Sequence, residues 1–345
     1  MKPLSTKTLE KKYAELGLSR DRTDLLHAYF LCFSNLYGVI SVGEAWNVFR
    51  EYEGTRLVHK KDFIAFSGIV QREPGHPYTV CELKEVYSGE TTEDPAERLI
   101  VNNRLIGTGY HKYILLYNTV DRQMNKPYYL PAEKTSFLAN AEDRFFLSPD
   151  GKLMVQFLGR LKTDGRNRSF DGKPCGEIRD PDGNPVAGKC LSDFVCYTRD
   201  EQFDIDYTKD EAKKEKLRQK YRTTALDKIL CYILRDIQTG GVLLTESPAG
   251  TMKFFMDFLS HDLGVPFTGD RTERFCELYT NLNNHSHLWQ NCGWRPDELR
   301  QSIPSGLPDS ISIGPNMKKL FEEGNLDQAA FEKQLKELGI RLSKE

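Results

Sequence analysis

Two histidines and a cysteine near the end of the chain are the residues with the clearest potential for chemistry. His285, His287 and Cys292 lie within NNHSHLWQNCGW, residues 283–294. Zinc in proteins takes about four nitrogen or sulfur ligands in a tetrahedral arrangement. The spacing H-x-H-x4-C matches none of the usual structural-zinc spacings. We therefore favour a structural role over a metal site, with Asn and Gly turning a helix end and Trp289 packed beneath it.

A second set of candidate metal ligands is three thiols in a loop-rich segment. Cys175, Cys190 and Cys196 lie among turns rich in Asp, Gly and Pro. Three thiolates in so short a segment suit zinc, with Asp193 or a distant histidine as the fourth ligand. Buried free cysteines on a sheet are the commoner outcome, and we prefer that interpretation.

Basic residues in the same segment form a candidate contact surface. The stretch GRLKTDGRNRSFDGK combines Gly turns and Phe170 with several cations, a pattern that suits phosphate contact and base stacking. The cations that we single out are Arg160, Lys162, Arg166 and Arg168. Neighbouring aspartates offset half of the charge, so an ordinary exposed hairpin tip is the simpler interpretation.

A further contact surface is predicted near the N-terminus. Helical apolar spacing marks RTDLLHAYFLCFSNLYG, AWNVFREYEG and KKDFIAFSGIVQRE, and HPYTVCELKEVYSG alternates like a strand or short hairpin. Three helices followed by a hairpin is the order of a winged helix-turn-helix unit, which we assign to residues 1–90. Lys60 and Lys61 open the third helix, but Asp62 and Glu73 dilute its charge. Protein contact is therefore favoured over DNA contact.

Composition narrows the class of protein. The 345 residues carry 48 basic and 50 acidic side chains, a net charge of −2, so no global field favours nucleic acid or anionic membranes. The first residues are charged and amphipathic rather than an export signal, and no apolar run reaches the length of a membrane span. The eight cysteines include no CxxC pair. We expect a cytoplasmic protein with reduced thiols and no membrane contact.

The rest of the chain is predicted to be a helical main domain, residues 91–300, with a small β-rich insertion at about 147–206. PAERLIVNNRLIGTG and LPAEKTSFLANAEDRFF have helical apolar spacing, whereas KLMVQFLGRL and LSDFVCYTRD are candidate strands of the insertion. One long helix is expected from KDEAKKEKLRQKYR into TTALDKILCYILRDI. A linker and a helical hairpin are expected over 301–345. The fold class is thus mainly α (α+β).

Three stretches carry a resemblance to a family. YFLCFSNLYGVISVGEAWNVF (29–49), KPYYLPAEKTSFLANAEDRFF (126–146) and NLNNHSHLWQNCGWRPDEL (281–299) resemble, in sequence and order, uncharacterised mainly helical proteins of gut-type Firmicutes. Many of those proteins carry a small C-terminal SEC-C zinc-binding tail. The resemblance implies a helical fold without assigned chemistry. No cysteine follows Cys292 here, so the zinc function of the tail is not carried over.

The functional expectation is a binding or regulatory protein rather than an enzyme. The sequence contains no P-loop, GxGxxG, GxSxG or HExxH motif. Its contact partner is expected to be a nucleic acid or another protein, with no cofactor. The alternative is a metal-dependent protein, either structured by zinc or a hydrolase or nuclease, that uses the insertion cysteines or the His285 and His287 cluster.

Overall fold

The computed structural model of the protein describes residues 3–87, 92–107, 112–169, 172–240, 248–267, 269–302, 310–312, 321 and 341–343. The chain divides into two compact units, Met1–Pro296 and Asp297–Glu345. In the second unit, strands β8 (Ser310–Ser312) and β9 (Arg341–Ser343) pair in parallel. Of the helical hairpin predicted over 316–339, only residue 321 is described. Helices dominate the described chain, so the predicted mainly α fold class is confirmed.

Hydrophobic side chains of the first unit gather into three clusters. Two of them, built around Phe30 and Val101, consist of residues of the first half of the chain together with Trp289, and we call this part the N-terminal lobe. The third is built around Ile233 and draws on residues from Met154 to Leu288, and we call this part the second lobe. In the described residues, no helix is long and apolar enough to cross a membrane.

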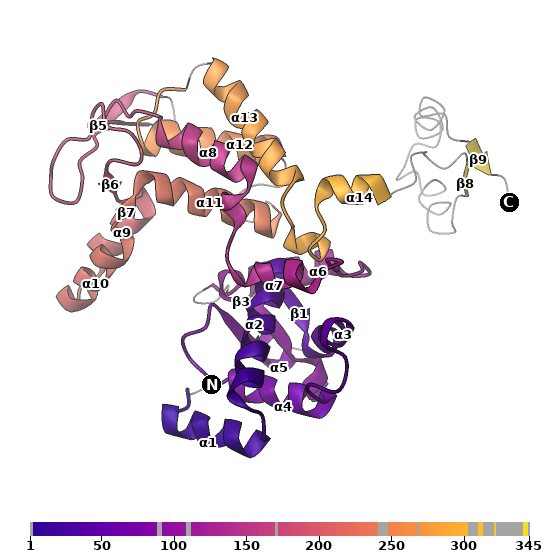
Figure 1. Cartoon of the computed structure of the whole chain (residues 1–345). Helices are drawn as coiled ribbons and strands as arrows, with labels where there is room; N and C mark the ends of the chain where they lie inside the picture. The colour runs from indigo at the N-terminus through magenta and orange to yellow at the C-terminus, as the bar shows by residue number, and fades with distance from the viewer. Residues whose placement is uncertain are drawn as a thin grey trace. The chain divides into compact units, whose positions relative to one another are not determined.

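The N-terminal lobe packs helices against a three-stranded sheet (Figure 1). Its main helices are α1 (Thr6–Leu16), α2 (Arg20–Tyr37), α3 (Val42–Glu53), α4 (Lys60–Val70), α5 (Leu83–Val86), α6 (Ile114–Gln123) and α7 (Lys134–Leu138). Its strands are β1 (Val39–Ser41), β2 (Tyr78–Cys81) and β3 (Leu99–Asn102), in the order β1-β3-β2 with both pairs antiparallel. From α2 to β3, the order along the chain is α2, β1, α3, α4, β2, α5 and β3.

Local signals place the helices of this lobe. The Ser41 hydroxyl accepts from the backbone N–H of Glu44 at 3.2 Å, which caps α3 as its Ser and Glu spacing predicts. Gly38 ends α2 at a φ of 72°, where a side chain would be strained. The predicted helix over PAERLIVNNRLIGTG is wrong: Leu99–Asn102 is strand β3, whose four residues are all buried. A strand buried on both faces is apolar throughout, and helical spacing does not distinguish it from a helix.

Helix α4, the third predicted helix, is largely covered. Phe63, Phe66, Ser67, Ile69 and Val70 are buried. Helix α1 packs along α4, and on the other side a Cβ at Gly68 would lie 3.0 Å from the Arg98 guanidinium. That guanidinium is held by Glu82 at 2.7 Å. The positively charged side chains of α4 are only the two that open it.

The second lobe combines helices with short strands, most of which lie within the predicted insertion at about 147–206. Its helices are α8 (Pro149–Gly159), α9 (Arg199–Tyr207), α10 (Glu211–Tyr221), α11 (Ala225–Thr239), α12 (Pro248–Asp257) and α13 (Gly269–Asn284), and its strands are the short β4 (Arg166–Arg168), β5 (Pro174–Glu177), β6 (Val195–Cys196) and β7 (Thr223–Thr224). Helix α8 packs against α11 and α13 (Figure 1). Apolar residues from the predicted insertion, such as Val186 and Leu191, are part of the same core.

Two predictions for this lobe are wrong. KLMVQFLGRL is not a strand, because SPDG before it is a helix start: the Ser148 hydroxyl accepts from the N–H of Gly151, and Pro149 takes the first turn of α8. The predicted single long helix is instead two helices, α10 and α11. Strand β7 separates them and pairs with β6. Thr224 then caps α11 through the N–H of Asp227.

A buried lysine connects three helices of the second lobe. Lys228 of α11 is only 5% exposed. Its Nζ donates to both carboxylate oxygens of Glu201 on α9, at 2.9 and 2.8 Å, and to the carbonyl of Tyr221 at the end of α10, at 2.8 Å. A buried ammonium requires such partners because it has lost its hydration. The α9–α10 pair is thereby attached to the lobe.

Candidate functional site

The segment after α13 joins the two lobes. Trp289 is fully buried in the N-terminal lobe, where its indole N–H donates to the carbonyl of Asn35 at 2.8 Å. The Gln123 amide donates to the carbonyls of both Tyr37 and Trp289 at 2.7 Å. A Cβ on Gly38 would come within 2.5 Å of the indole, so only glycine permits this contact. The structural interpretation of NNHSHLWQNCGW therefore accounts for Trp289.

Two of the three candidate ligands in this segment take part in the same packing. The Cys292 thiol is buried and lies 3.7 Å from the carbonyls of Gln123 and Lys126. Burial raises the pKa of this thiol to about 11, so the free thiol is protonated at neutral pH. His287 stacks on Tyr129, with Nδ1 2.6 Å from the carbonyl of Gly293. Because a carbonyl oxygen can only accept a hydrogen bond, Nδ1 is the nitrogen that carries the proton in this contact.

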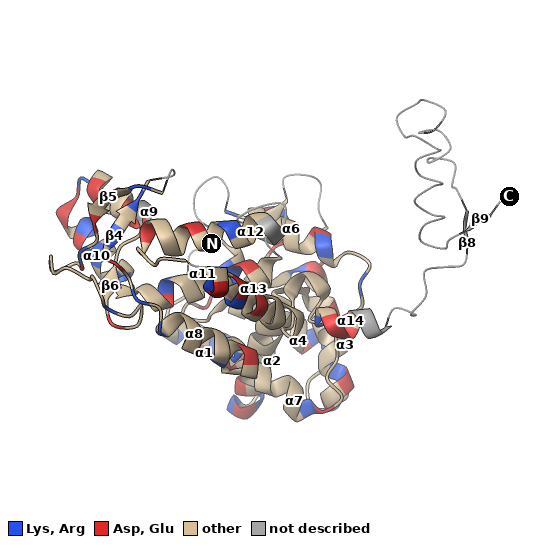
Figure 2. Ribbon diagram, turned by 90° about the horizontal axis from the view of Figure 1, so that it is seen from above, with Lys and Arg blue, Asp and Glu red and all other residues tan. Residues whose placement is uncertain are grey.

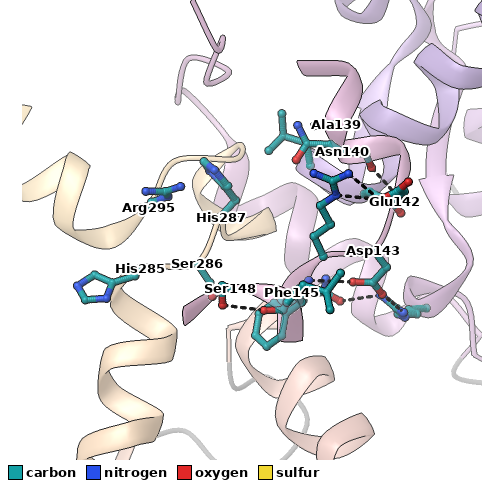
Figure 3. Close-up of a pocket in the computed structure, with 16 residues that line it drawn as sticks. Ala139, Asn140, Glu142, Asp143, Phe145, Ser148, His285, Ser286, His287 and Arg295 are labelled. Carbon is teal, nitrogen blue, oxygen red and sulfur yellow. Dashed lines mark hydrogen bonds and ion pairs between the residues drawn. The ribbon is translucent and has the colours of Figure 1, made fainter. Parts of the chain in front are cut away.

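A cavity of about 450 Å³ lies beside this junction, and we call it the interlobe cavity (Figure 3). Residues from both lobes line it. Arg104 and the 139–145 segment belong to the N-terminal side, and Gln238 and His285 to the second lobe. Arg104 bridges the two sides, since its guanidinium donates to Asp143 and, at 3.3 Å, to the Gln238 side chain. The cavity is within the size range of small-molecule sites.

The polar lining of the interlobe cavity is rich in groups that favour an anion. Three arginines line it against two carboxylates, and two histidines lie on the wall opposite the carboxylates (Figure 3). Both carboxylates already have a cationic partner: Asp143 pairs with Arg104, and Glu142 pairs with Arg144 at 2.7 Å. Apolar contact comes from Leu36, Ala139, Phe145 and Leu147. This lining suits a small ligand with an apolar body and one negative group.

His285 is placed at the mouth of the cavity rather than in a metal cluster. Its side chain is 51% exposed and its Nδ1 lies 2.9 Å from the Asp150 carboxylate. Asp150 is in the first turn of α8, so the pair joins the start of α8 to the end of α13. The candidate metal ligands His285 and His287 thus both line the cavity.

The insertion cysteines do not come together as a ligand set. Cys175 is exposed, Cys190 is partly buried and Cys196 is buried, and all eight cysteines are free. Burial raises the pKa of the Cys196 thiol to about 12, which disfavours the thiolate that a metal would need. Among the described residues, these thiols do not belong to any group of three His, Cys, Asp or Glu side chains close enough to share a metal ion. The same holds for His285, His287 and Cys292.

The predicted cationic contacts are also distributed over separate places. Lys60 and Lys61 are exposed at the start of α4, and Arg160, Lys162 and Arg166 are exposed on the second lobe. Arg168 is instead held in place by Asp164 and by the Ser260 carbonyl, to which it donates at 3.1 Å. Around β4, β5 and α10, acidic residues alternate with the basic ones (Figure 2). The insertion therefore presents charges of both signs.

One group of potential ligands was missed by sequence analysis. His27, Glu73 and His76 each offer a ligand atom, and these atoms lie within 4.8 Å of one another. Their positions in the chain, on α2 and on the connection from α4 to β2, gave no motif.

Comparison with protein-family models, curated proteins and solved structures gives no match for this chain. The function is therefore argued from the geometry of its own sites.

Proposed function

We propose that the protein is a binding protein with a regulatory role, and that it takes a small organic anion in the interlobe cavity. The observation that carries this proposal is the lining of the cavity, where three arginines and the histidines of the 285–287 segment lie together with four apolar residues. Both carboxylates on the wall are already paired with arginine, which reduces their repulsion of an anion.

Binding of such a ligand would depend on how the two lobes are arranged. It would contact residues near Arg104 and Arg144 on one side and near His287 on the other, so its binding would stabilise the arrangement in which the cavity exists. A ligand that binds one arrangement better shifts the population by its differential affinity. This coupling is the regulatory part of the proposal.

The proposal is tested with small anions that would bind in the cavity and with a substitution that would fill it. Benzoate and phenyl phosphate serve as anionic probes, and benzamide is the neutral counterpart of benzoate. We expect both anions, but not benzamide, to raise the melting temperature of the wild-type protein by a few degrees, since a ligand at about 100 times its Kd adds about 2.7 kcal/mol. In Ala139→Trp, whose side chain enters the cavity, we expect affinity for both anions to fall at least about tenfold.

The control is Ala132→Trp, which adds the same side chain at an exposed position outside the cavity lining. It should bind the probes like the wild type. Equal stabilisation by benzamide, or unchanged binding by Ala139→Trp, would contradict an anion site in this cavity.

Nucleic-acid contact is the weaker proposal. The order of helices and strands in the N-terminal lobe supports a winged-helix-like unit, and its exposed Lys60 and Lys61 suit phosphate contact. Five residues of α4 are buried, α1 packs along it and no other basic residue lies on it, which favours a protein partner for this lobe. Fluorescence polarisation with labelled DNA and RNA at low salt is expected to give no saturable binding, and salt-sensitive binding lost in Lys60→Ala/Lys61→Ala would reverse this preference.

A further inference from the structure

The N-terminal lobe contains a second cluster that shares no residue with the interlobe cavity. His27 comes from α2, whereas Glu73 and His76 come from the turn that follows α4. Gly75 between them has a φ of 98°, a conformation that side chains other than glycine disfavour. This turn brings the side chains of Glu73 and His76 close to each other.

The geometry of the cluster is close to that of a three-ligand metal site. His27 Nε2 lies 3.6 Å from one oxygen of Glu73, and His76 Nε2 lies 3.6 Å from the other. Zinc bonds of about 2.0–2.1 Å in a tetrahedron place neighbouring ligand atoms about 3.4 Å apart. At 3.6 Å, the nitrogens are too far from the carboxylate for good hydrogen bonds. The 3.6 Å spacing is thus closer to the distance between two atoms that bind the same metal ion than to a hydrogen-bond distance.

Two tyrosines orient the cluster. The hydroxyl of Tyr78 lies 2.8 Å from Nδ1 of His27, and hydrogen bonds of this kind usually orient metal-bound histidines. The hydroxyl of Tyr13 donates to Oε2 of Glu73, the oxygen that faces His27, and lies 3.3 Å from Nε2 of His27.

The cluster is partly open to solvent. The side chains are 18% (His27), 19% (Glu73) and 27% (His76) exposed, so an ion can reach them.

We infer that His27, Glu73 and His76 form a site for a divalent transition metal of the zinc class, with a solvent molecule as a fourth ligand. Two histidines and one glutamate are a ligand set that zinc accepts while keeping a position open. Tyr13 of α1 contacts the carboxylate, so an ion here would also fix α1 against the rest of the lobe.

The test uses the full chain, stripped with chelator and freed of any affinity tag. We expect one equivalent of Zn²⁺ to bind and to raise the melting temperature. We also expect Co²⁺ to give the visible absorption of a four-coordinate nitrogen and oxygen site. His76→Ala and Glu73→Gln should each weaken Zn²⁺ binding by more than about tenfold, while His59→Ala, which removes an exposed histidine of the same lobe, should not.

Three outcomes would overturn the inference. The first is no bound Zn²⁺ at micromolar free metal, and the second is equal binding by the wild type and His76→Ala. The third is thiolate-to-cobalt absorption that disappears in Cys175→Ser, which would assign the ion to the insertion cysteines instead. Because His76 is partly exposed, its replacement leaves the apolar core of the lobe intact, and the circular dichroism spectrum of the variant verifies this.

Discussion

Trp289→Ala is expected to lower the free energy of unfolding by about 4 kcal/mol, more than any other single substitution that we propose. The indole is fully buried, packs on Gly38 and belongs to the apolar cluster that contains Val101 and Leu116. Its loss would leave a cavity in the N-terminal lobe and remove the hydrogen bond to Asn35. Urea unfolding followed by circular dichroism measures the change.

Two matched variants separate the parts of this effect. Trp289→Phe keeps most of the volume but loses the N–H donor, and we expect it to cost about 1–2 kcal/mol. Trp294→Ala removes a partly exposed tryptophan of the same segment, whose N–H donates to the Pro127 carbonyl at 3.0 Å, and should cost less than Trp289→Ala. If Trp289→Ala and Trp294→Ala cost the same, the two lobes are not joined chiefly by Trp289.

The second large effect concerns the buried lysine of α11. Glu201→Ala is expected to cost about 3 kcal/mol, because it leaves the Lys228 ammonium buried with only the Tyr221 carbonyl as a partner. Lys228→Met should cost less, since methionine fills a similar volume without a charge. The double variant Glu201→Ala/Lys228→Met should therefore be more stable than Glu201→Ala alone, which a double-mutant cycle in urea measures.

A surface ion pair provides the control for this cycle. Glu215 and Arg218 on α10 are both about half exposed and 3.5 Å apart. Glu215→Ala should change the free energy of unfolding by no more than about 0.5 kcal/mol. A Glu201→Ala cost as small as this would mean that water reaches Lys228 when its partner is removed, so that the pair does not secure α9 and α10.

The parts of the fold that follow from local chemistry could be predicted from the sequence. The end of α2 at Gly38, the cap at Ser41 and the start of α12 at Pro248 each depend on residues a few positions apart. Strand β3 was mistaken for a helix because its residues are apolar on both faces. Helix α8 was mistaken for a strand because Ser-Pro-Asp-Gly suits a turn as well as a helix start.

The sites were harder to predict, since tertiary packing assembles them. His285 and His287 were recognised as unusual, but two of the three arginines that share their cavity, Arg104 and Arg144, lie far away in the chain. His27 and Glu73 are brought together by the packing of α2 against the turn after α4, and their spacing matches no motif. In the sequence, Lys228 is one of several polar residues of α11, and only the fold places Glu201 beside it.

The docking of Trp289 has a consequence for synthesis of the protein. The indole binds at Asn35, a residue made 254 positions earlier. At roughly 5–20 residues per second, the ribosome needs about 13–50 s to add that length of chain. During this time, the surface around Gly38 that later receives the indole has no partner from the segment that covers it in the native protein. This apolar surface of the N-terminal lobe therefore remains exposed, where chaperones or other nascent chains can bind it, until almost the whole first unit has been translated.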